Sequence, residues 1–152
     1  MIAALYTVMT YFVSAFDLAS GAIQVRLSEA LTILPAFTPA AIPGLFVGCI
    51  ISNTLTGCAF FDIVFGSLAT LLGAIGTYAV RKKHRILASL PPILANTLIV
   101  PFVLQYVYQF PGGIPYFMLT VGAGEIISCG ILGQALYAAL KPVDRIFRLD
   151  TV

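Results

Sequence analysis

Long apolar runs separated by short polar links fill most of this chain of 152 residues. A helix needs about 20 mostly apolar residues to cross the hydrocarbon core of a bilayer. Runs of this kind cover residues 1–16, 39–55, 60–80, 86–109 and 114–140. A further amphipathic piece, residues 26–35, is too short to span alone, so it is either a short sixth helix or a re-entrant arm.

Composition supports a membrane protein. Hydrophobic residues make up 60% of the chain and charged residues 9%, with a mean hydropathy of +1.02, whereas a soluble domain averages about 25% charged residues. We therefore predict an all-α integral membrane protein, a compact bundle of six transmembrane helices of which the second is short. At this length, residues 1–152 are expected to form a single domain.

The basic residues predict the orientation. Seven of the eight lie in two clusters, residues 81–85 and 141–148. Basic loops stay in the cytoplasm, so both clusters are expected inside, and the links at 56–59 and 110–113 outside. The amino terminus is also cytoplasmic if residues 26–35 cross the membrane. Because topology explains the basic residues, the net charge of +2 gives no indication of nucleic-acid binding.

Acidic residues, in contrast, lie in or beside the apolar runs. These are Asp17, Glu29, Asp62 and Glu125. An ionisable group in hydrocarbon is costly, so by default it marks a functional site. At about 1.5 Å per residue, Glu125 and Asn96 lie near mid-membrane, and Asp62 and Asn53 within a turn of the outer surface. The sequence thus predicts a polar pocket that opens outward.

Each of these residues has a structural alternative. Glu125 follows two glycines that let a ligand approach closely, but a buried glutamate also serves as a neutral carboxyl or as a partner between helices. Glu29 can pair with Arg26, three residues earlier. Asp62 can cap the helix that it begins. Asn53 and Asn96 can form interhelical hydrogen bonds, worth about 1 kcal/mol.

Other motifs are weak or absent. Gly44 and Gly48 have the spacing of closely packed membrane helices, within the chain or with a partner. The cysteines Cys49, Cys58 and Cys129 lack a C-x-x-C spacing, so we expect no metal. The phosphate-binding loop and the common hydrolase motifs are missing, so we predict neither an enzyme nor a cofactor.

Five segments of the chain, in order, resemble the QueT family, the substrate-binding S components of energy-coupling-factor transporters proposed to import queuosine precursors. They are residues 23–35, 37–49, 62–72, 90–96 and 122–129. The resemblance implies six helices in a bacterial cytoplasmic membrane, partnered by a transmembrane T component and two ATPase subunits. The implied cargo is a 7-deazaguanine, such as the 7-cyano or 7-aminomethyl base, or queuine.

With that cargo, Glu125 is expected to accept hydrogen bonds from the N1–H and 2-amino group of a guanine-like edge. Glu29 or Asp62 is expected to pair with an aminomethyl cation, and Arg26 binds either ligand or Glu29. The remaining candidates for polar or stacking contacts with the ligand are Gln24, Asn53, Asn96, Tyr106, Phe110 and Tyr116. Candidates for the interface with the T component are Ala3, Ala4, Gly44 and Gly48.

Three rival hypotheses fit the same residues. The same scaffold can carry a different vitamin-like solute. A stand-alone ion-coupled carrier or channel would also contain acids within its spans. An intramembrane enzyme is the weakest alternative, because no nucleophile and base lie together at a sensible depth.

Overall fold

Every regular element in the described part of the chain is helical. The computed structural model describes residues 1–15, 26–83 and 86–143. The elements are α1 (Ile2–Ala15), η1 (Leu27–Ala36), α2 (Ala41–Leu55), α3 (Phe60–Val80), η2 (Ile86–Ser89), α4 (Leu90–Tyr106), α5 (Ile114–Glu125), η3 (Ile126–Leu132), α6 (Gly133–Leu140) and η4 (Lys141–Val143). The predicted all-α class is confirmed for these residues.

Three helices of the described residues are long and apolar enough to cross a membrane. They are α3, the continuous η2–α4 helix Ile86–Tyr106, and the continuous α5–η3–α6 helix Ile114–Leu140. The apolar helices α1, η1 and α2 are shorter. Six helical rods therefore occur where the sequence predicted them, but six crossings of the membrane remain a prediction.

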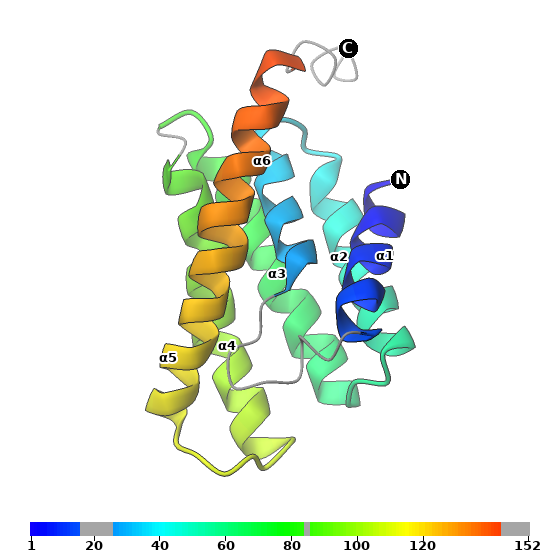
Figure 1. Cartoon of the computed structure of the whole chain (residues 1–152), viewed down its shortest axis with the longest axis vertical. Helices are drawn as coiled ribbons and strands as arrows, with labels where there is room; N and C mark the ends of the chain where they lie inside the picture. Colours follow the sequence, from blue (N-terminus) through cyan, green and yellow to red (C-terminus); the bar gives the residue numbers. More distant parts are fainter. Residues whose placement is uncertain (16–25, 84–85, 144–152) are drawn as a thin grey trace.

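The short η1 helix lies in the middle of the bundle. Figure 1 shows successive rods running in alternate directions, with η1 enclosed by the others, and η1 contacts α1, α2, α3, α6 and η3. Eight consecutive residues, from Ser28 to Pro35, are buried. As a 3₁₀-helix it rises about 2.0 Å per residue, so its ten residues extend about 20 Å. A short segment thus carries its polar side chains deep into the bundle.

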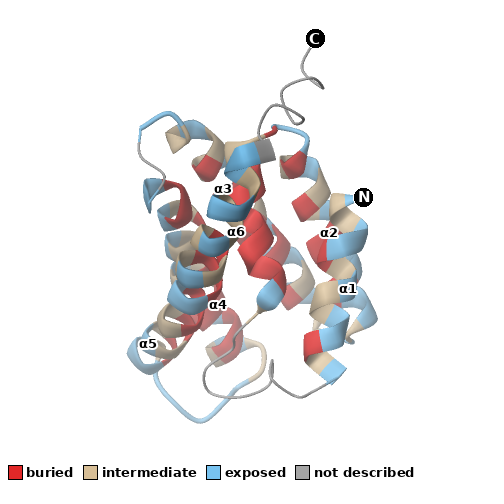
Figure 2. Ribbon diagram, turned by 45° about the horizontal axis from the view of Figure 1, so that its top comes forward, coloured by how far each residue is buried: buried red, intermediate tan, exposed pale blue. Residues whose placement is uncertain are grey.

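The bundle has a buried apolar core, but it also exposes many apolar side chains and buries acidic ones. Large apolar side chains such as Phe12, Leu98 and Leu119 are exposed, whereas Glu29 and Glu125 are buried. Figure 2 shows exposed residues along the outward faces of the helices and buried ones toward η1. This distribution is typical of a protein that has lipid around it and a polar site within it.

Close packing of α1 on α2 uses Gly44 and Gly48. A Cβ at Gly48 would lie 2.9 Å from Cβ of Tyr6 and 3.0 Å from Cα of Ala3, and one at Gly44 would lie 3.0 Å from Cβ of Ile2. The glycine spacing is therefore a helix contact within this chain. Of the four residues expected at a partner interface, the two glycines and Ala3 lie in this internal contact, while Ala4 is exposed.

Candidate substrate-binding site

A cavity of about 250 Å³ lies at the end of the bundle formed by the α2–α3 and α4–α5 links. Its lining is Thr10, Val13, Ser14, Arg26, Ser28, Asn53, Thr56, Cys58, Asp62, Val100, Leu104, Tyr108 and Phe110. Ser28, Asn53 and Asp62 are buried polar residues of this wall. The size suits a small ligand, since pockets for drug-sized molecules begin at about 300 Å³.

Asp62 is held in the cavity wall by Tyr108. The Tyr108 hydroxyl donates to Oδ2 of Asp62 at 2.9 Å and accepts from the backbone N–H of Ala59 at 3.1 Å. Burial raises the pKa of the Tyr108 phenol above its ordinary value, so it remains a donor at neutral pH. α3 begins at Phe60, and no side-chain hydrogen bond caps it at Ala59. The Asp62 carboxylate bonds to Tyr108 instead, so its predicted role as a helix cap is not seen.

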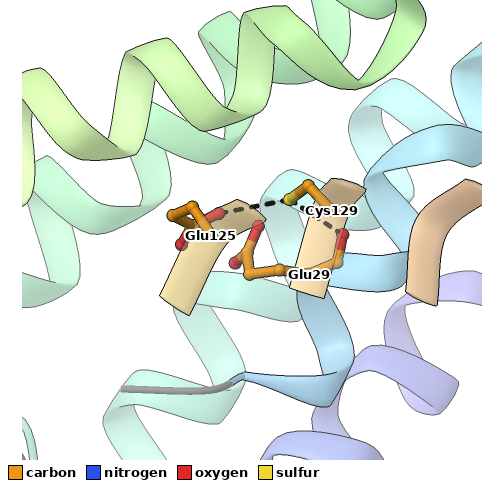
Figure 3. Close-up of side chains that lie close together, drawn as sticks. All are labelled: Glu29, Glu125 and Cys129. Carbon is orange, nitrogen blue, oxygen red and sulfur yellow. Dashed lines mark hydrogen bonds between the residues drawn. The ribbon is translucent and has the colours of Figure 1, made fainter. Parts of the chain in front are cut away.

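An inner polar cluster lies beneath the cavity, and Figure 3 shows three of its members. The Tyr6 hydroxyl donates to Oε1 of Glu29, and Nδ2 of Asn96 lies 3.5 Å from Oε2. Sγ of Cys129 lies 3.1 Å from Oε2 of Glu125 and 3.4 Å from the Glu29 carbonyl oxygen, and its single S–H can donate to either. Carboxylate oxygens of Glu29 and Glu125 and the Cys129 sulfur lie within 4.8 Å of one another.

Residue spacing along three helices gives the depth of the inner cluster relative to the cavity. On each helix, a residue of the cavity wall lies four positions from a residue within or beside the cluster, as in Thr10 and Tyr6, Asn53 and Cys49, and Val100 and Asn96. Four residues of an α-helix span about 6 Å. The cluster thus lies about one helical turn deeper than the cavity, which gives the site two levels.

A π-helical segment begins directly after Glu125. Glu125 ends α5, and η3 (Ile126–Leu132) continues the same rod with Ser128 and Cys129 buried. Such wider turns are rare and occur frequently at functional sites. Here the segment carries the thiol that bonds to Glu125.

Arg26 supplies positive charge next to these acids. It lines the cavity, and its guanidinium interacts electrostatically with Asp62 and Glu29. The hydrogen bonds to the Glu29 side chain come from Tyr6 and Asn96. Within the described residues, Arg26 and Glu29 form no ion pair at 4 Å or less, so the predicted salt bridge is an electrostatic contact at longer range.

The structure divides the predicted site residues into three groups. Arg26, Asn53, Asp62 and Phe110 line the cavity, and Glu29, Asn96 and Glu125 form the inner cluster. Tyr106 is 69% exposed and lies in an apolar surface groove with Phe61 and Phe65, and Tyr116 is 49% exposed. Neither tyrosine lines the cavity. Gln24 lies outside the described residues.

Sequence reasoning missed Tyr6, Ser28, Tyr108 and Cys129. Cys129 lies four residues after Glu125, so their shared helix face was a usable signal. The spacing of the cysteines along the chain does not reveal this cluster, because Glu29, Glu125 and Cys129 converge from two segments. Carboxylates and thiolates are ligands that zinc accepts, but the absence of a metal remains a prediction.

Known proteins resemble this chain over much of its length. The family model described as QueT transporter matches residues 1–142. A similar protein from Lactococcus lactis subsp. cremoris, named queuosine precursor transporter QueT, is 35% identical over 72 residues, which are 47% of this chain and 42% of that relative. The matched region is thus less than half of either protein, and no solved structure matches significantly. Since the family model extends over nearly all of its length, the chain belongs to the QueT transporter family.

Proposed function

We propose that this protein is the substrate-binding S component of an energy-coupling-factor importer and takes up a queuosine precursor. The family and the name of the Lactococcus relative support a queuosine precursor as cargo. The proposed partners are a transmembrane T component and two ATPases. The phosphate-binding loop that this chain lacks would then lie on those ATPases.

The observation that carries the proposal is the two-level polar site inside an apolar bundle. The cavity walls offer Asn53 and Asp62, and the cluster about one turn deeper offers Glu125 and Asn96. A flat heterocycle with polar groups at both ends needs hydrogen-bonding partners at two depths. A dry site strengthens each such bond and penalises a ligand that leaves one unmade.

Glu125 is proposed to bind the edge of the base. A guanine-like edge presents N1–H and a 2-amino group side by side, and one carboxylate can accept from both. Glu125 is 5% exposed, and its carboxylate contacts the weak thiol donor Cys129 and the side-chain amide of Asn96. A stronger pair of N–H donors can replace that thiol.

In the proposed orientation, the cavity faces the outside of the cell. The described basic residues Arg81, Lys82, Lys83 and Lys141 lie at the opposite end of the bundle from the α4–α5 link. With the basic end in the cytoplasm, the cavity opens toward incoming substrate. Six crossings then put the amino terminus inside as well.

Calorimetry with the purified protein in detergent tests the proposal. We expect 7-deazaguanine bases to bind and adenine to fail, and Glu125→Gln to weaken binding by about tenfold or more, since hydrogen bonds to a charged group are worth about 1.5–3 kcal/mol. Unchanged binding by that variant would remove Glu125 from the site. Preference for an unrelated vitamin would favour a different cargo, and flux in liposomes without partners or ATP would favour a stand-alone carrier.

A further inference from the structure

The polar interior carries more acidic than basic side chains. Among the described residues inside the bundle, the carboxyl groups of Glu29, Asp62 and Glu125 face one guanidinium, that of Arg26. Buried charges must be paired or neutralised. Glu29 and Glu125 approach within 4.8 Å, and the repulsion between two carboxylates this close favours a proton on one of them. With that proton and Arg26 counted, one negative charge is left over.

Asp62 is the acid best placed to receive a missing positive charge. It is 5% exposed, yet it lines the cavity. Tyr108 donates to its Oδ2, whereas its Oδ1 has no hydrogen bond to any residue that the structure describes. A carboxylate has about four acceptor positions, so Asp62 retains capacity for a ligand.

The inner acids are less available. Both oxygens of Glu29 receive donors from the protein, Tyr6 and Asn96. The Glu125 carboxylate accepts from Cys129, and neither glutamate lines the cavity. A charged group entering the cavity therefore meets Asp62 first.

We propose that the substrate of this protein carries a positive charge and that its charged group binds Oδ1 of Asp62. This inference rests on the proposed function. Among 7-deazaguanines, the aminomethyl base and queuine carry an amine that is protonated at neutral pH, whereas the 7-cyano base is neutral. With the base edge at Glu125, the substituent on the five-membered ring extends back toward the cavity and Asp62.

The matched pair of 7-aminomethyl-7-deazaguanine and 7-cyano-7-deazaguanine provides the test. Calorimetry on the full-length protein is expected to give about tenfold or more tighter binding of the aminomethyl base, as a charge-assisted hydrogen bond predicts. Asp62→Asn is expected to bring the two affinities within about threefold of each other. Asp62→Glu is expected to keep the preference, because it keeps a carboxylate in the cavity wall.

The outcomes separate this inference from the proposed function. If the cyano base binds as tightly as the aminomethyl base, the inference is overturned while the proposed function stands. If neither base binds, both fail. If Asp62→Asn keeps the preference, the assignment to Asp62 is wrong. The comparison of the two bases on the unaltered protein needs no variant, so it decides the charge of the substrate even if Asp62→Asn fails to fold.

Discussion

The carboxylates of Glu29 and Glu125 approach to within 4.8 Å at the centre of the bundle, although one comes from η1 and the other from the end of α5. Cys129 connects the two segments, because its thiol lies within hydrogen-bonding distance of the Glu125 carboxylate and of the Glu29 backbone carbonyl oxygen. The thiol thus contacts the carboxylate of one glutamate and the backbone of the other. This contact fixes the short helix against the longest one.

Removing the Tyr6 hydroxyl is expected to destabilise the fold. Tyr6→Phe deletes a buried donor to Glu29 and leaves a carboxylate oxygen without its partner, which costs about 1–3 kcal/mol of unfolding free energy. Thermal unfolding in detergent should show a midpoint lower by several degrees. Tyr11→Phe, the same change at an exposed position of α1, is the control and should leave the midpoint unchanged. Equal midpoints for both variants would show that the Tyr6–Glu29 bond contributes little.

Tyr108→Phe is expected to weaken substrate binding more than it weakens the fold. The hydroxyl orients Asp62 and accepts from Ala59 at the rim of the cavity. Without it, Asp62 gains freedom that binding must then remove, so we expect Kd to rise by about threefold to tenfold. Calorimetry measures this change. Tyr137→Phe, at the other end of the bundle where Tyr137 packs on Phe37, should bind normally, and an unaltered Kd for Tyr108→Phe would contradict the proposed role.

Cys58 is expected to report on both the cavity and the orientation. It lines the cavity and is partly exposed, whereas Cys49 and Cys129 are buried. A membrane-impermeant thiol reagent should therefore label intact cells at one cysteine. Bound 7-deazaguanine should slow that labelling, and Cys58→Ser should abolish it. Labelling seen with inside-out vesicles but not with intact cells would reverse the proposed orientation.

The α1–α2 contact is expected to tolerate no side chain at Gly48. In Gly48→Ala the added methyl group meets the backbone of Ala3 at 3.0 Å, so the helices must separate, at a cost of about 1–3 kcal/mol. Gly130→Ala is the control, because its nearest neighbours would lie 3.7 Å or more from the new Cβ. Thermal unfolding of the two variants tests this difference. A melting midpoint for Gly48→Ala as high as that for Gly130→Ala would mean that α1 shifts without cost.

Several helix boundaries were predictable because apolar length and prolines determine where a membrane helix can form. The predicted run 60–80 coincides with α3, and the run 114–140 coincides with the α5–η3–α6 rod. The run 86–109 ends earlier, at Tyr106, because the next residues form the loop that carries Tyr108 into the cavity wall. Hydropathy cannot identify such a loop while its residues remain apolar.

The sequence predicted which residues belong to the candidate site better than it predicted which of them contact one another. Depth along each helix indicated that Asn53 and Asp62 lie nearer the outer surface than Asn96 and Glu125, and the structure has them at two levels in that order. Depth along a helix could not indicate which way the side chains of that helix face. Tyr106 has the same depth as residues of the cavity wall, but its side chain points away into an apolar groove.

The sequence by itself determined that this is an apolar helical chain with basic residues after its apolar segments and acids within them, because length, hydropathy and charge are local properties that the bilayer selects directly. Only the tertiary structure decided that Glu29 meets Glu125 and Cys129, and that Asp62 bonds with Tyr108 instead of capping its helix. Those contacts depend on the rotation and packing of helices far apart in the chain. Such contacts are fixed by side-chain fit and hydrogen-bonding partners, which no pattern along one helix specifies.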